Sequence, residues 1–258
     1  MADPLFSIRN LSRIFPPAAV GAGEIRAVLG VNLDIFTGEC LLIAGSNGSG
    51  KTLLMRMIAG LMEQSEGEIL FQGRPLIRDA ALRRQVGLIF QDADAQILGE
   101  TVAEDVAFGP KNLGLSKEEI KSRVDRALEA TGLSLKGDFP PRRLSGGEKR
   151  RLAVAGVLAM GCDTVIMDEP FANLDWPGVV LVLEIIREIK NSGRTLIILT
   201  HELEKVLAFA DRLIILDRGM IRDEGKPEAV LDRLNPAFGV RDPRRSYVSV
   251  GDCTWLLP

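Results

Sequence analysis

The stretch that most constrains this chain is Gly45 to Thr52, which has the G-x-x-x-x-G-K-T pattern typical of loops that cradle phosphate. An apolar run at 40–44 precedes it and an amphipathic segment at 53–60 follows it, so the sequence predicts strand, loop and helix in that order. Glycines let backbone N–H groups turn inward around a phosphate, at a helix N-terminus whose partial positive charge favours anions. We expect phosphate contacts from the loop residues Gly45, Ser46, Asn47, Gly48, Ser49, Gly50, Lys51 and Thr52. The alternative, a Gly/Ser-rich turn that contains a lysine, is disfavoured by both flanks.

Two side chains of this loop have specific expected roles. Lys51 should reach the β- and γ-phosphates of a nucleotide, and the Thr52 hydroxyl should bind Mg²⁺. The loop therefore predicts ATP and Mg²⁺ as cofactors.

Length and composition bound the remaining possibilities. The 258 residues suit one large α/β domain with room for a subdomain, and the net charge of −3 gives no basic field that would indicate a nucleic-acid partner. Cys40, Cys162 and Cys253 are far apart and form no C-x-x-C, so neither a disulfide framework nor a zinc site is expected. No signal-peptide pattern opens the chain, and no apolar run approaches the roughly 20 residues that span a bilayer. We expect a cytoplasmic protein whose membrane role, if any, is peripheral and through partner proteins.

Continuous apolar runs alternate with amphipathic segments along most of the chain. This pattern predicts a largely parallel sheet covered by helices on both faces. The expected buried strands are 40–44, 86–91, 164–169, 195–200 and 213–216, and the expected helices are 53–60, 148–160, 179–190 and 227–234. Alternating segments at 5–10, 25–35 and 67–73 predict an antiparallel edge sheet, and the prolines and glycines of 15–23 predict a loop.

The pattern changes between 92 and 141, where 117–131 forms a clear amphipathic helix with Ser116 and Glu119 as a capping box and Gly132 as its stop signal. We expect a helical subdomain inserted into the α/β core. The predicted organisation is one domain over 4–234, with its core at about 4–91 and 144–234, the helical subdomain at about 92–143, and a tail at 235–258.

Asp168 and Glu169 stand at the end of an apolar strand, where open α/β sheets place their ligands. Neighbouring residues on a strand point to opposite sides, so the two carboxylates should have different roles. We expect Asp168 to hold Mg²⁺ through its water shell and Glu169 to polarise the attacking water. The alternative is an acidic pair that merely ends a strand.

Two further features have a competing structural explanation. A helix begins at Ser145, Gly146 and Gly147 with no lysine among them, which suits a second anion site that completes a nucleotide site in another subunit. By spacing alone, however, an ordinary capped helix with a flexible entry is the favoured explanation. His201, the only histidine, directly follows the strand at 195–200, where it could reach a γ-phosphate, although a lone histidine is often structural.

In their order along the chain, these motifs resemble those of the ATP-binding cassette (ABC) ATPases over nearly the whole length. The resemblance rests on the phosphate loop (45–52), Gln91 of the Q-loop, the LSGGE signature (144–148), the VIMDE strand (165–169), the D-loop (172–175) and the switch histidine His201. It implies the mostly parallel fold of phosphate-loop NTPases with an antiparallel edge and a helical insertion. It also implies a dimer of cassettes that clamps two ATP molecules, with Gln91 contacting Mg²⁺ and the catalytic centre, and with an adenine-stacking aromatic at Phe15.

A narrower resemblance begins after Gln91. The stretches 92–98, 101–110 and 149–160 are similar to the energy-coupling factor ATPases, which drive uptake of vitamins or of cobalt and nickel ions. The chain departs from the family pattern at Lys149, a variation that is common in this group. It also departs in the D-loop at Asn173 and Trp176, which bear on communication between the two sites and not on the hydrolytic residues.

The leading hypothesis is an ATP-hydrolysing motor at the cytoplasmic face of the cell membrane. It implies three kinds of partner: a second ATPase subunit, a transmembrane coupling subunit and a substrate-binding membrane subunit. A soluble ABC ATPase that acts on ribosomes or DNA, a cassette of another transporter class, and a subunit that binds ATP without hydrolysing it remain as alternatives. Whether the cassette pairs with itself or with a paralogue, and which solute is carried, stay open.

Overall fold

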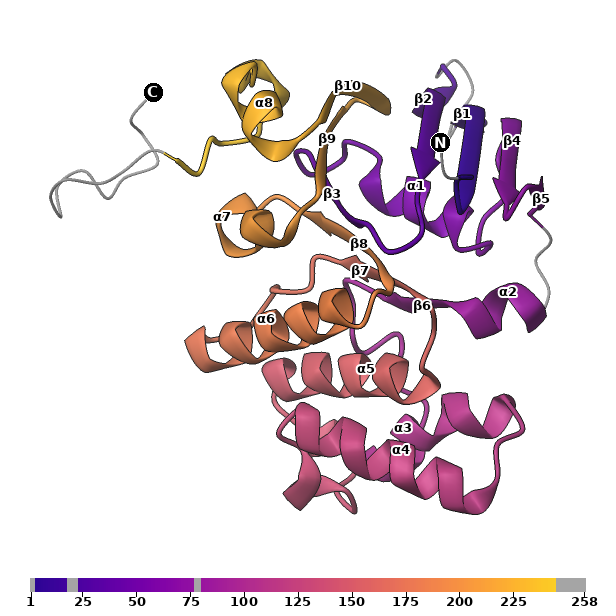
Figure 1. Ribbon diagram of the computed structural model, residues 1–258, viewed down its shortest axis with the longest axis vertical. Coiled ribbons are helices and arrows are strands. Elements are labelled where there is room, and N and C mark those ends of the chain that lie inside the picture. The colour runs from indigo at the N-terminus through magenta and orange to yellow at the C-terminus, as the bar shows by residue number, and fades with distance from the viewer. Residues whose placement is uncertain (1–2, 18–22, 77–79, 245–258) are drawn as a thin grey trace, which may run out of the picture.

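The computed structural model of the chain describes residues 3–17, 23–76 and 80–244, and Figure 1 shows the arrangement of their helices and strands. A four-stranded antiparallel sheet has the order β2-β1-β4-β5. Its strands are β1 (Phe6–Phe15), β2 (Ile25–Ile35), β4 (Glu66–Phe71) and β5 (Arg74–Pro75). This is the antiparallel sheet that the alternating segments predicted.

A six-stranded sheet forms the centre of the molecule, in the order β10-β9-β3-β8-β7-β6. Its strands are β3 (Cys40–Ala44), β6 (Val86–Ile89), β7 (Thr164–Asp168), β8 (Thr195–Thr200), β9 (Arg212–Asp217) and β10 (Met220–Gly225). All pairs are parallel except β9 with β10. The predicted mostly parallel sheet is confirmed.

Helices cover both faces of this central sheet, and a group of them lies at one end of the molecule (Figure 1). They are α1 (Lys51–Ile58), α2 (Ala80–Gln85), α3 (Val102–Asn112), α4 (Lys117–Ala130), α5 (Gly146–Met160), α6 (Trp176–Asn191), α7 (Leu203–Val206) and α8 (Pro227–Asp232). Short 3₁₀ turns lie at 134–136, 141–143, 207–209 and 236–238. Among the described residues, no helix combines the length and apolar character that a membrane span requires.

The strands of the central sheet alternate their side chains between two hydrophobic cores. Leu42 and Ile198 pack with α5 and α6 on one face. Leu41 and Leu199, one position along, pack with α1 and the antiparallel sheet on the other face. Because both faces are buried, these strands are apolar throughout, which is why the sequence shows runs instead of alternation there.

A third core holds α3, α4 and part of α5 together as a helical subdomain, at the end of the molecule opposite the antiparallel sheet (Figure 1). Helix α5 belongs to two cores, because Ala153 and Val157 face the central sheet whereas Leu152 and Ala155 face the subdomain. The helix therefore joins the two parts of the fold.

The structure corrects several expected boundaries. Strand β1 runs on to Phe15, which the sequence assigned to a loop, because Phe15 pairs with Ile25 of β2. Helix α5 begins at Gly146, two residues earlier than expected, because the Ser145 hydroxyl caps it. Helix α3, which the sequence did not define, follows a capping box at Thr101.

Parts of the predicted loop at 15–23 and the predicted tail lie outside the described residues, including the apolar end of the tail at 255–257.

The capping box that begins α4 allows a stability test. The Ser116 hydroxyl accepts a hydrogen bond from Glu119 N–H, and the Glu119 carboxylate accepts one from Ser116 N–H. We expect Ser116→Ala to destabilise α4 by about 1 kcal/mol. Amide hydrogen exchange in the first turn of α4 should then accelerate about fivefold. Ser116→Asp, which keeps a capping acceptor, is the control, and equal exchange in Ser116→Ala and the parent chain would contradict the assignment.

Candidate active site

The site forms where three neighbouring parallel strands end. In the order β3-β8-β7, the phosphate loop follows β3, His201 follows β8, and Glu169 follows β7. The register aligns these ends, since Ala44 pairs with Thr200 and Asp168 pairs with Leu199. Groups far apart in the sequence are thereby brought to one edge of the sheet, as expected for an open α/β fold.

The phosphate loop is shaped by glycines that no other residue could replace without strain. Gly48 and Gly50 have φ values of 80° and 102°, in the left-handed region. A Cβ at Gly45 would lie 2.2 Å from the Leu216 carbonyl oxygen. A cavity of about 390 Å³ lies against the loop, and it is lined by Ala27, Asn47, Gly48, Ser49, Gly50, Lys51, Thr52, Leu53, Gln91, Asp168 and Glu169.

Lys51 is the cation of this cavity and is only 6% exposed. Its Nζ donates to the carbonyl oxygens of Gly45 and Ser46, at 2.7 and 3.2 Å, and lies 3.9 Å from Glu169 Oε1. Burial lowers the pKa of Lys51, while the carboxylates of Glu169 and Asp168 act in the opposite direction. An anion in the cavity would meet a buried positive charge whose partners in the structure are two carbonyl oxygens and one carboxylate.

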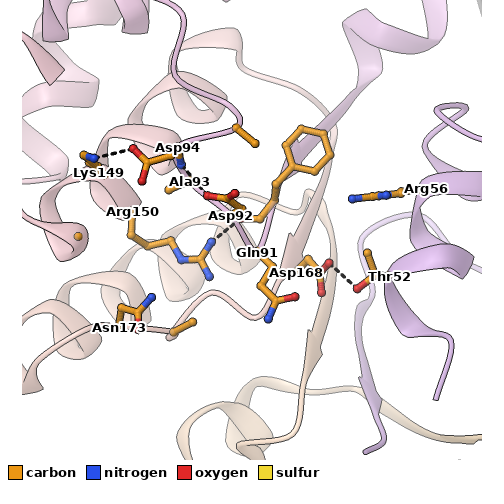
Figure 2. Close-up of a pocket in the computed structure, with 14 residues that line it drawn as sticks. Thr52, Arg56, Gln91, Asp92, Ala93, Asp94, Lys149, Arg150, Asp168 and Asn173 are labelled. Carbon is orange, nitrogen blue, oxygen red and sulfur yellow. Dashed lines mark hydrogen bonds and ion pairs between the residues drawn. The ribbon is translucent and has the colours of Figure 1, made fainter. Parts of the chain in front are cut away.

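Thr52 and Asp168 make direct contact, because the Thr52 hydroxyl donates to Asp168 Oδ2 at 2.8 Å (Figure 2). The second oxygen, Asp168 Oδ1, is buried and has no hydrogen-bond partner among the described residues. Burial is the largest cause of the raised pKa of Asp168. A hydroxyl beside a carboxylate with a spare oxygen is a donor set that fits Mg²⁺, which prefers hard oxygen ligands.

Glu169 differs from the expectation that it would end the strand. Strand β7 stops at Asp168, and Glu169 has φ 48°, a left-handed conformation that turns the chain. The carboxylate is buried, accepting from the Thr200 hydroxyl at 3.0 Å through Oε2, and its Oε1 lies 3.0 Å from His201 Nδ1. Asp168 and Glu169 do have different partners. What separates their side chains, however, is this turn of the backbone and not the alternation of side chains along a strand.

His201 and Gln91 lie at the open side of the site. The His201 ring is 47% exposed, and its contact with Glu169 fixes one ring nitrogen toward the carboxylate. Gln91 is two residues beyond the end of β6, and it lines both the phosphate-loop cavity and a second cavity of about 720 Å³. Figure 2 shows Gln91 between Asp168 and the segment that carries Asp92 and Asp94.

Comparisons with known proteins agree with this geometry. A family model described as ABC transporter matches residues 28–172, more than half of the chain. The chain belongs to the ABC transporter ATP-binding proteins. It is accordingly an ABC ATPase, which hydrolyses ATP for transport.

Named relatives narrow the resemblance. The energy-coupling factor transporter ATP-binding protein EcfA of Methanocaldococcus jannaschii is 41% identical over 205 residues, which cover 78% of this chain and 74% of EcfA. The structure of CbiO1 from Clostridium perfringens, described as part of the ABC transporter complex cbiONQ, superposes with a TM-score of 0.75 at 35% identity, covering 90% of this chain and 92% of CbiO1. The structure of a dimeric ATP-binding cassette in a post-hydrolysis state, bound to ADP and phosphate, superposes with a TM-score of 0.77 at 26% identity. The match covers 86% of this chain and 98% of that cassette.

The remaining predicted residues of the ABC ATPase lie away from the phosphate loop. Ser145 and Gly146 are exposed at the N-terminus of α5, and Gly146 lines the larger cavity. Gly147 faces the segment of Asn173, whose φ of 62° is one that asparagine tolerates better than most residues. Phe15 is partly exposed at the end of β1 and carries the Arg13 guanidinium 4.6 Å above its ring. The described residues thus place neither the signature nor Phe15 on the phosphate-loop cavity.

Two residues of the site escaped the sequence analysis. Thr200 donates to Glu169, and its only signal was its place before His201. Arg150 is 2% exposed and donates to the carbonyl oxygens of Phe90 and Glu169. Its sequence context, a basic run in a helix, indicates an exposed side chain.

The bond from Thr200 gives a direct test of the site. Thr200→Val keeps the shape but leaves a buried carboxylate oxygen of Glu169 without its donor, so we expect a loss of about 1–3 kcal/mol in the free energy of unfolding. We also expect turnover of ATP to fall. Thr200→Ser, which keeps the hydroxyl, is the matched control, with urea unfolding and steady-state hydrolysis as measurements. A valine variant as stable and active as the serine variant would contradict the role of this bond.

Proposed function

We propose that this ABC ATPase is the motor subunit of an energy-coupling factor type importer, which powers uptake of a vitamin or a transition-metal ion. The observation that carries the hydrolytic part is the convergence of Lys51, Asp168 and Glu169 at one edge of the sheet. The importer part is supported by the similarity to EcfA and to CbiO1.

In the proposed reaction, the N–H groups and glycines of residues 45–50 hold the phosphates of ATP, and Lys51 moves from its carbonyl partners to the β- and γ-phosphates. Thr52, Asp168 and Gln91 hold Mg²⁺. When bound, that ion supplies positive charge at the phosphate oxygens. Glu169 accepts the proton of the water that attacks the γ-phosphorus, as the bond to the bridging oxygen breaks and leaves ADP and phosphate. His201 orients Glu169 and the γ-phosphate.

The signature residues have a role in the partner cassette. Ser145, Gly146 and Gly147 are at the N-terminus of a fifteen-residue helix, where backbone N–H groups and the helix dipole favour an anion. Because they do not line the chain's own phosphate-loop cavity, we propose that they close over ATP held by a second cassette, either a copy of this chain or a paralogue. Phe15 is proposed to stack on adenine at the outer end of the site.

The coupling surface lies next to Gln91. A cavity of about 640 Å³ is lined by Asp94, Ile97, Gly99, Glu100, Pro140, Pro141, Arg142 and Lys149, with Leu98 exposed beside it. We propose that helices of a transmembrane coupling subunit dock here, at the cytoplasmic face of the membrane, so that closure of the ATPase dimer moves them. A separate membrane subunit would bind the solute.

The proposed organisation is one ABC ATPase domain over 4–234 with a tail at 235–258. Its core comprises about 4–91 and 144–234, and about 92–143 form the helical subdomain. Helix α5, which shares both cores, is the joint between them.

Glu169→Gln tests the hydrolytic assignment. The amide cannot take the proton, so we expect kcat to fall by about 10²- to 10⁴-fold, with ATP affinity within a few-fold because the phosphate loop is untouched. Glu202→Gln, which removes a nearby carboxylate that pairs with Lys205, is the control. Steady-state phosphate release and nucleotide titration provide the readouts. Unchanged turnover in Glu169→Gln would remove Glu169 from the proposed role.

Purification of a tagged chain from gently solubilised cells tests the importer assignment. We expect co-purification of two membrane proteins, one of them a small substrate binder, together with an ATPase partner. Recovery with ribosomes or DNA would favour the soluble alternative. The identity of the neighbouring genes would test the same partners independently, and an adjacent pair of membrane-protein genes is the expected result.

A further inference from the structure

Arg150 is a charged side chain in a place where most helices bury an apolar one. It lies in the second turn of α5 and is 2% exposed, among the largest fully buried side chains of the described residues. Within the described residues it forms no ion pair, and its guanidinium donates to two backbone carbonyl oxygens, those of Phe90 and Glu169. Burial is the main cause of its lowered pKa, while the carboxylates of Asp168, Glu169 and Asp92 act in the opposite direction. Burying a full charge is costly even with such surroundings, so a structural account alone would favour an apolar residue of similar volume.

The first carbonyl fixes the base of the Q-loop. Phe90 immediately precedes Gln91, and its N–H donates to the side chain of Gln96 at 3.1 Å while its C=O accepts from Arg150. Both polar backbone groups of Phe90 are therefore held by side chains after β6 has ended. Gln91 starts from this fixed point, and Figure 2 shows the Arg150 guanidinium beside it.

The second carbonyl belongs to Glu169 itself. Its N–H donates to the Leu199 carbonyl at 2.8 Å, and its C=O accepts from Arg150 and also from Ala172 N–H at 3.2 Å, so the left-handed turn is held from both sides. A left-handed conformation costs a residue with a side chain roughly 1–2 kcal/mol, and it persists where the surroundings hold it. The direction of the Glu169 carboxylate depends on this turn.

The third connection runs along the helix. Arg150 is five residues from Ser145, about 7.5 Å along the axis at the usual helical rise. Helix α5 is buried against the helical subdomain as well as the central sheet, so its N-terminus and Arg150 move as one body. One side chain thus connects the signature, the Q-loop and the turn that aims Glu169.

We propose that Arg150 is a positioning residue that makes the alignment of Gln91 and Glu169 depend on the orientation of the signature helix. This inference rests on the proposed role of Glu169 in hydrolysis. When α5 is packed as in the structure, the Arg150 guanidinium holds the carbonyl oxygens of Phe90 and Glu169, and the Glu169 carboxylate is aimed at the attacking water. When the subdomain shifts, those bonds lengthen and hydrolysis slows while the phosphate loop, which Arg150 does not contact, still holds ATP.

Arg123 of α4 provides a matched control. Its guanidinium also donates to two backbone carbonyl oxygens, those of Ala159 and Met160 at 3.3 and 2.9 Å, which lie at the C-terminal end of α5. It lines neither the phosphate-loop cavity nor the proposed coupling surface. A general effect of an arginine that ties α5 to its surroundings would appear in both residues, whereas positioning of Glu169 would appear in Arg150 alone.

The test compares Arg150→Met, Arg150→Lys and Arg123→Met in the full chain, by steady-state hydrolysis, ATP titration and urea unfolding. For Arg150→Met we expect kcat per folded molecule to fall about 10- to 100-fold with KM for ATP within about threefold, since misalignment of a catalytic group has effects of this size. Arg150→Lys should recover part of kcat, because an ammonium can reach one carbonyl but lacks the fork that holds two. Arg123→Met should keep kcat per folded molecule within about threefold, because its two carbonyl partners lie at the other end of α5.

A merely structural role predicts something different. It would lower the free energy of unfolding while leaving kcat per folded molecule unchanged, and that result, or a raised KM with kcat kept, overturns the proposal. If Arg150→Met does not fold, Arg150→Lys decides by the same criteria, with lowered kcat at constant KM as support and unchanged kcat as refutation.

The double variant Arg150→Met/Glu169→Gln, measured by single-turnover hydrolysis of radiolabelled ATP, separates this proposal from the one on which it rests. If Arg150 acts through Glu169, Arg150→Met costs much less in the Glu169→Gln background than in the parent chain, and the loss that remains is the part that acts through Gln91. A full additional loss overturns positioning of Glu169. Glu169→Gln with normal turnover instead refutes the proposed hydrolytic role, whereas a blocked Glu169→Gln beside a normal Arg150→Met refutes only the inference about Arg150.

Discussion

The parallel pairing of β3, β8 and β7 is the constraint on which the rest of the site depends. Each strand contributes one element of the chemistry at its carboxyl end: the phosphate loop, the pair Thr200 and His201, and the pair Asp168 and Glu169. Because both faces of the sheet are buried, a slip of one residue in any strand would send its side chains to the wrong core. The packing that stabilises the fold therefore also fixes the distances between the groups that are proposed to contact ATP.

The sequence was most informative where chemistry and local structure coincide. The phosphate loop, the acids at 168–169 and His201 could be predicted because each follows an apolar run whose end a parallel sheet must bring to one edge. The mostly parallel sheet could be predicted for the same reason, since runs such as 195–200 are apolar on both faces. The start of α4 was predictable from two residues, Ser116 and Glu119, because a capping box is satisfied locally.

What the sequence could not provide depends on contacts between distant segments. Arg150 belongs to the site because it meets the carbonyl of Phe90, 60 residues earlier, and that of Glu169, 19 residues later. A basic run at the start of a helix gives no sign of such partners, since the usual place for arginine is the surface. The turn at Glu169 was missed for a related reason: the strand pattern continues through it, whereas bonds to Leu199, Ala172 and Arg150 hold the residue in a left-handed conformation. Phe15 was assigned to a loop because its strand partner Ile25 lies beyond that loop.

Helix α5 is buried in two cores at once, which explains why communication between the signature and the turn at Glu169 would run through this one helix. A helix with one apolar face can tilt on its partner, but α5 has apolar residues toward the sheet and toward α3 and α4, and it can shift only if one of those cores shifts with it. Its polar side chains are concentrated at its N-terminal end, where Ser145 is exposed to solvent while Arg150 is buried against the left-handed turn at Glu169. A nucleotide that is held by a partner cassette and contacts Ser145 of this chain would therefore act on the position of Glu169 in this chain. Because α5 packs in both cores, it is stiff enough to transmit that contact. A movement of the helix would then act on Phe90 and Glu169 through the two hydrogen bonds that Arg150 donates to their carbonyl oxygens.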